Sequence, residues 1–405
     1  MRYLLIGGLV ALVAIVGGST VLGRRLPGPL GVLSRTGLGF LLLGILMGPT
    51  ALDAFDRVGS DGTSLRSTLE PITALAMAWI GVLYGCHLEW ARMRRFGAGL
   101  YVVTAIEGTA ATVAVCGAAF LVLCAWTPAR WSAGEALAAA AFCGAAASGT
   151  APTGLFLLRE EARMSGPIYE RLLFFSALDD LPGLVVLAVL FAVAREDAGP
   201  GMGALGWLAT TVATGYALSW LLRLLLRPGL DREGLFVGLL GVLALAAGLC
   251  GALRLSPLVV GVVAGCAIAN SAPQKERIFE ALQSREHTLY VVFLVLVGSL
   301  VRVEPGQELV IPLLIGALMV ARLGAKVVGV SAPGAVGLAA AVPARAGLAL
   351  LPQGGMTIAM AASFADAYPG PAAQAAAAAT VLAVFLNDLL GAQLAPPALA
   401  GLRRG

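Results

Sequence analysis

The chain has 405 residues, of which 59% are hydrophobic and only 12% are charged, about half the charged share of a soluble globular protein. Its net charge is +4 and its mean hydropathy is +0.89. These values exclude a series of soluble domains, and they predict one all-α polytopic membrane domain over residues 1–405.

Apolar segments with few charges recur along the whole chain. Stretches of about 20 such residues are long enough to cross a hydrocarbon core of ~30 Å as helices. The first one ends in a poor cleavage site, so we interpret it as a helix and not as a signal peptide. We predict about thirteen transmembrane helices, at residues 3–22, 36–54, 71–89, 97–126, 134–158, 167–194, 203–222, 234–253, 255–271, 288–301, 308–330, 346–365 and 374–400.

The basic residues alternate between the loops that join these helices. Odd-numbered loops carry more arginine and lysine than their even-numbered neighbours, which places them in the cytoplasm by the positive-inside rule. We therefore expect an inner-membrane protein with its N-terminus outside, its C-terminus cytoplasmic and no soluble regulatory domain after the last helix. The cytoplasmic basic residues are Arg24, Arg25, Arg35, Arg92, Arg94, Arg95, Arg159, Arg163, Arg171, Arg223, Arg227, Arg232, Lys275, Arg277, Arg285, Arg403 and Arg404.

Two of the predicted helices contain helix breakers in mid-membrane, at residues 147–154 and 350–357. Broken helices at matching positions of two halves indicate a transporter built from inverted repeats. We expect five-helix repeats over about 36–194 and 255–400, with linker helices over about 203–253. A plain proline kink is the alternative interpretation of either break. Polar side chains that we expect to line an ion site at the breaks are Ser148, Thr150, Thr153, Gln353 and Thr357.

The carboxylate pair Asp179 and Asp180 lies in an apolar helix, where an ionisable side chain costs ~2.5–3.5 kcal/mol and is therefore a functional candidate. Adjacent helical residues point ~100° apart, so one carboxylate can bind a cation while the other is paired. A carboxylate that holds either a proton or a cation gives the simplest antiport mechanism. Pro182 also frees the carbonyl of Leu178. A solvated pair at a helix end is the alternative.

The basic residues Arg322 and Lys326 are four positions apart on one helix face. A buried cation needs a partner, and the aspartate pair is the obvious one. Because a buried lysine titrates more readily than an arginine, we predict a proton-carrying Lys326 and a structural Arg322. Snorkelling to the cytoplasmic interface is the alternative. Glu107 is isolated in its helix, and it either pairs with one of these cations or makes a simple polar contact.

Several segments resemble the monovalent cation:proton antiporter superfamily, which has the sodium/proton antiporter fold. They cover nearly the whole chain and occur in the family's order. These segments are Gly44-Ile45-Leu46-Met47-Gly48-Pro49, the helix end at 81–89, the Asp179-Asp180 pair, Ser256-Pro257-Leu258 through Asn270, Phe293 through Gly298, and Arg322 with Lys326.

The resemblance implies a homodimer in a lipid bilayer that exchanges Na⁺ or K⁺ for protons and serves pH homeostasis, without a cofactor. It also implies that the paired acids Asp179 and Asp180 accompany electrogenic exchange. One departure is that Gln353 and Gly355 stand where many relatives carry an Arg and a Glu. This makes Glu107 a candidate substitute acid.

Three rival functions are weaker. A sodium-coupled symporter of a small organic anion on the same fold would need anion-binding groups, for which the helices offer few candidates. A passive channel would not need a titrating pair beside a cation. An intramembrane enzyme is disfavoured because neither a Gly-x-Gly-Asp nor a His-Glu-x-x-His string is present. Nothing indicates binding to nucleic acid.

Overall fold

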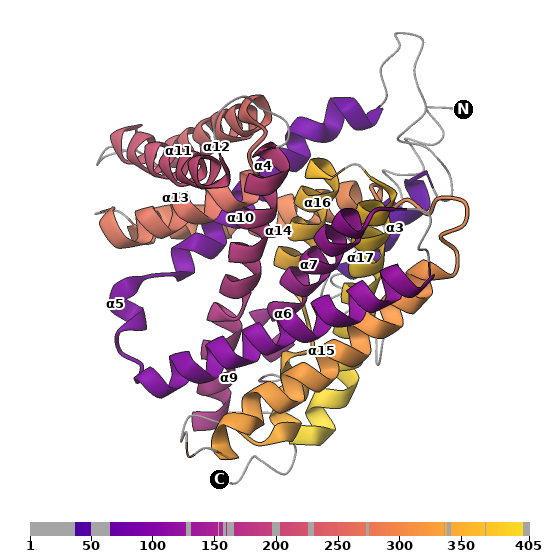
Figure 1. Ribbon diagram of the computed structural model, residues 1–405. Coiled ribbons are helices and arrows are strands. Elements are labelled where there is room, and N and C mark those ends of the chain that lie inside the picture. Colours follow the sequence, from indigo (N-terminus) through magenta and orange to yellow (C-terminus); the bar gives the residue numbers. More distant parts are fainter. Residues whose placement is uncertain are drawn as a thin grey trace.

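The structure is a computed structural model, and every regular element that it describes is a helix (Figure 1). The described residues are 37–49, 65–126, 131–152, 154–156, 159, 166–196, 203–225, 231–272, 275–335, 337, 342–368 and 370–399. The predicted helix at 3–22 and the candidate Thr153 lie outside them. The helices are α3 (Leu38–Met47), α4 (Leu65–His87), α5 (Trp90–Met93), α6 (Ala98–Trp126), α7 (Ala133–Ser148), α9 (Pro167–Leu178), α10 (Asp180–Glu196), α11 (Ala204–Leu225), α12 (Arg232–Leu253), α13 (Pro257–Ser271), α14 (Lys275–Gly298), α15 (Val310–Ala335), η1 (Ala344–Leu350), α16 (Gly354–Ala367) and α17 (Pro371–Leu399).

Each predicted span from residue 36 onward overlaps one of these helices or a broken pair of them. Local signals set several starts: Ser132 and Glu135 form a capping box at α7, and the Ser256 hydroxyl accepts from the N–H of Val259 at α13. The predicted start of a span at 288 agrees with the apolar part of α14, which begins at Thr288, although the helix itself already begins at Lys275. Its charged first turns continue the helix outside the apolar belt.

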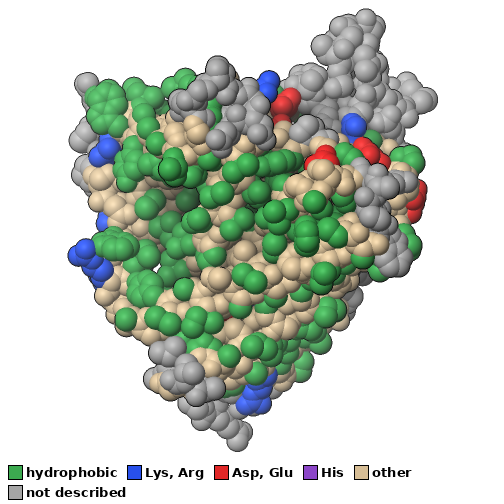
Figure 2. Space-filling model, in the orientation of Figure 1, with side chains coloured by type: hydrophobic (Ala, Val, Ile, Leu, Met, Phe, Trp, Pro, Cys, Tyr) green, Lys and Arg blue, Asp and Glu red, His purple; other side chains and the backbone are tan. Residues whose placement is uncertain are grey.

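The surface is that of a membrane protein. Seven helices among the described residues are long and apolar enough to cross a bilayer, or eight if the bent pair η1–α16 counts as one span. Large apolar side chains face outward on several of them, including Leu121, Leu205 and Val320. Figure 2 shows a face whose middle is apolar, with the charged side chains near its edges.

The helices form two packed groups (Figure 1). In the first, α4 and α13 pack with their backbones in contact, and α11 and α12 lie beside them. A Cβ on Gly265 would lie 2.1 Å from the carbonyl oxygen of Val82, so this close approach needs glycine. In the second group, α6 lies along α15, and α7 and α17 pack behind them.

Two interruptions meet inside the second group. The helix α7 ends at Ser148 and is followed by extended residues 149–151, which we call the first break. The segment η1 ends at Leu350 and is followed by residues 351–353, the second break, after which the chain turns by 61° into α16. The N–H of Ala151 donates to the carbonyl of Pro352 over 2.7 Å, so the two breaks contact each other directly.

Candidate ion-binding site

The two aspartates lie where α9 gives way to α10, and both are buried. Asp179 is the residue between the two helices, and its carboxylate binds the first break. Its Oδ1 accepts from the N–H of Thr150 at 3.2 Å, and its Oδ2 accepts from the Thr150 hydroxyl at 2.6 Å. Both oxygens of Asp179 therefore accept hydrogen bonds from Thr150.

Asp180 is in a different position. Its carboxylate lies against Gly149 of the first break, where a Cβ would come within 1.6 Å of Oδ1. Among the described residues, no hydrogen bond or ion pair reaches this carboxylate, although Asp180 is only 4% exposed. The pair thus divides into one partnered and one unpartnered acid.

Lys326 lies between two acids in the core. Its ammonium is 2.6 Å from Oε1 of Glu107 and 2.8 Å from Oδ2 of Asp179. It also contacts the Thr150 hydroxyl at 3.1 Å and the carbonyl oxygen of Ser148. All three charged side chains are 0% exposed, so Lys326 does not snorkel to the membrane surface. Ser148 contributes its carbonyl, because its hydroxyl donates to its own helix at Ala145.

Arg322 joins the two breaks, one helical turn before Lys326. Its guanidinium donates to the carbonyl of Gly149 at 2.7 Å and to that of Leu350 at 2.9 Å. It also donates to the carbonyls of Ala147 and Leu351. These carbonyls end α7 and η1, where the helix dipoles are negative, so a fixed cation stabilises both ends. None of its hydrogen bonds goes to an aspartate.

The second break is held by amides and one acid. The N–H of Gln353 donates to Oδ1 of Asp388 at 2.7 Å. The Gln353 side chain donates to the carbonyl of Ala146 at 2.9 Å and accepts from Asn387 at 2.7 Å. The Thr357 hydroxyl donates to the same Ala146 carbonyl. Gln353 and Thr357 therefore link the second break to α7, and neither contacts Asp179 or Asp180.

The comparisons with known proteins can be set against this geometry. The family model for the transmembrane domain of sodium/hydrogen exchangers matches residues 8–399. The chain belongs to the sodium/hydrogen exchanger family. Members of this family exchange cations for protons across a membrane and are transporters, so the chain is a multi-pass membrane antiporter and not a catalytic enzyme.

A solved structure supports the fold of this exchanger. The chain is similar to the sodium proton antiporter MjNhaP1 from Methanocaldococcus jannaschii, with 17% sequence identity and a TM-score of 0.62. The alignment covers 99% of this chain and 98% of that one. No curated protein sequence matches the chain.

Sequence reasoning missed Asp388 of this exchanger. It is 5% exposed on α17 and binds the second break, much as Asp179 binds the first. The signal was present, because an acid in the middle of the predicted span 374–400 meets the same criterion that selected Glu107. The pair Asn387-Asp388 lies within the continuous helix α17, whereas Asp179-Asp180 lies at the junction of α9 and α10.

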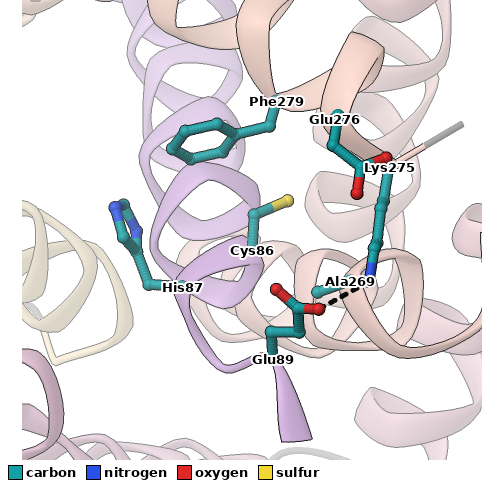
Figure 3. Close-up of a pocket in the computed structure, with 7 residues that line it drawn as sticks. All are labelled: Cys86, His87, Glu89, Ala269, Lys275, Glu276 and Phe279. Carbon is teal, nitrogen blue, oxygen red and sulfur yellow. Dashed lines mark hydrogen bonds and ion pairs between the residues drawn. The ribbon is translucent and has the colours of Figure 1, made fainter. Parts of the chain in front are cut away.

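A separate pocket opens where α4 ends and α14 begins (Figure 3). Its side chains include Cys86, His87 and Phe279, and a Lys275–Glu89 ion pair of 2.5 Å crosses its mouth. It contains none of the predicted ion-site residues. His87 is the last residue of α4 and is exposed.

Proposed function

We propose that this family member is a secondary active antiporter that exchanges Na⁺ or K⁺ for protons, with Asp180 as the group that binds either ion. The observation that carries this is the buried Asp180 carboxylate, which has no partner among the described residues and lies against the first break. A buried, unpaired carboxylate is costly, and it is stabilised by taking up a proton or a cation.

The neighbours of Asp180 fit this exchange. The negative charge of Asp179, adjacent to Asp180, attracts a cation. The ion pair between Lys326 and Asp179 compensates one of the two aspartate charges. The first break frees backbone carbonyls from helical hydrogen bonds, and in this structure Arg322 and Lys326 donate to those of Ala147, Ser148 and Gly149. Asp180 is therefore the cation ligand in this proposal, and Asp179 is the partner of Lys326. Ser148, Thr150, Gln353 and Thr357 shape the site around them.

The remaining features of the proposal follow the family resemblance. The protein works by alternating access as a homodimer in the inner membrane, with its N-terminus outside and its C-terminus in the cytoplasm. Repeats at about 36–194 and 255–400 place the two breaks at matching positions. Exchange is electrogenic, with more protons than cations moved per cycle. Each net charge that crosses the membrane then contributes a driving force of ~2.3 kcal/mol per 100 mV of membrane potential.

The test is exchange in proteoliposomes that contain a pH-sensitive dye. Addition of Na⁺, K⁺ or Li⁺ to vesicles with an imposed pH gradient should collapse the gradient for wild type. Asp180→Asn should abolish this response, because the amide cannot take up a proton or balance a cation. The control Glu280→Gln removes an acid from the exposed start of α14 and should leave exchange unchanged.

Two outcomes would contradict the proposal. Folded wild-type protein that responds to none of the three cations would exclude this antiport and favour the organic-anion symporter. An active Asp180→Asn variant would leave antiport standing but would remove Asp180 from it.

A further inference from the structure

The ammonium of Lys326 has as many strong acceptors as it has protons. A lysine ammonium has three N–H donors and no acceptor. In the structure it donates to Asp179, to the carbonyl of Ser148 and to the Thr150 hydroxyl, and it forms an ion pair with Glu107. A neutral amine would turn its lone pair toward one of these oxygens. The geometry therefore keeps Lys326 charged.

Two acids in this cluster share one directly bound cation: the other buried cation nearby, Arg322, donates to the carbonyls that end α7 and η1 and forms no ion pair with either acid among the described residues. Glu107, Asp179 and Lys326 are all 0% exposed, and two ionised carboxylates share a single ammonium. An excess charge in a dry interior is costly, and one proton removes it. With Lys326 fixed as a cation, that proton has to be on a carboxylate.

The contacts decide between the two carboxylates. Asp179 is the better stabilised anion, because it accepts from the Thr150 N–H, the Thr150 hydroxyl and Lys326. Glu107 has only Lys326, and its Oε2 is buried without a hydrogen-bond partner among the described residues. The charged groups that act on Glu107 are Lys326 and Arg322 from α15, with Asp179 and Asp180 from the α9–α10 segment.

We propose that Glu107 is a second proton-binding residue of the exchange cycle and that Lys326 remains charged throughout. The inference rests on the proposed function, in which a cation replaces the proton of Asp180. A cation at Asp180 adds positive charge close to Glu107 and drives the Glu107 proton off its carboxylate into the water on the open side. For each cation bound, one proton is then released from Asp180 and one from Glu107, and Lys326 keeps its proton.

The experiment measures charge movement and cation uptake together, in proteoliposomes adsorbed on a solid-supported membrane. It compares the wild-type protein with three variants. Wild type should give a cation-dependent current. Glu107→Gln imitates the protonated acid, so it should still exchange cations for protons, more slowly, with the current lost. Lys326→Arg keeps a cation that does not titrate and should still give a current. Glu280→Gln is the matched control for loss of an acid and should behave as wild type.

The outcomes separate the two proposals. No exchange by wild type would overturn the proposed function itself. Electroneutral exchange by wild type, or a current that survives in Glu107→Gln, would leave antiport intact and overturn the role of Glu107. A current lost in a folded, exchanging Lys326→Arg variant would assign the second proton to the lysine.

A measurement on wild type avoids variants that fail to fold. Infrared difference spectra of protein labelled with ¹³C-glutamate report protonated glutamate side chains directly. Addition of the transported cation should remove a carboxylic-acid band that shifts with the label. No label-sensitive band change on saturating cation would overturn the proposal.

Discussion

The first and second breaks have similar backbones but different partners. The first break lies among Asp179, Asp180 and Lys326, and Asp180 has no partner among the residues that the structure describes. The second break is held by Gln353, Asn387 and Asp388, which are joined to one another and to α7 by hydrogen bonds. A satisfied polar network rigidifies its surroundings, whereas an unsatisfied buried charge creates a demand for a ligand. The difference is the reason for our proposal that the first break binds ions and the second supports it.

Among substitutions that test this contrast, removal of the Lys326 side chain should cause the largest loss of stability. Lys326→Ala leaves Glu107 and Asp179 buried without their common cation, which should lower the free energy of unfolding by about 3–5 kcal/mol. Chemical unfolding in detergent, followed by tryptophan fluorescence, measures this. Lys275→Ala breaks the more exposed pair with Glu89 and should cost at most about 1 kcal/mol. An equal loss of unfolding free energy in the two variants would contradict the view that the charges at the first break are buried and depend on Lys326.

An apolar substitution at Gln353 should have a smaller effect, confined to stability. Gln353→Met keeps the length of the side chain but leaves the Asn387 amide without its acceptor, which should cost about 1–3 kcal/mol. The same unfolding measurement applies, with Gln283→Met on the exposed part of α14 as the control. Cation-dependent exchange should persist, and its complete loss in a folded variant would place Gln353 in the ion path.

Loss of charge at Asp388 should have the smallest effect. In Asp388→Asn the amide oxygen still accepts from the N–H of Gln353, so only the interaction of the charge with the start of α16 is lost, about 1 kcal/mol. The KM for the transported cation should stay at its wild-type value in the proteoliposome assay. A large increase in KM would show that both breaks bind cations, and the contrast between them would fail.

The sequence by itself determined the membrane class, the helix order and the positions of both breaks. Hydropathy over about 20 residues and the placement of proline and glycine act locally, so they can be recognised along the chain. The same local criterion selected Glu107, Asp179, Asp180, Arg322 and Lys326, and applied to the last helix it would have included Asp388.

The tertiary structure alone decided which of these groups meet. Residues 107, 179 and 326 are far apart in sequence, and the packing of α6 against both α15 and the α9–α10 segment places a single ammonium between two acids. Adjacent aspartates look alike in sequence, yet one accepts from Thr150 and the other has no described partner. Their difference depends on directions and distances of a few ångströms between helices, which no periodicity in the chain encodes.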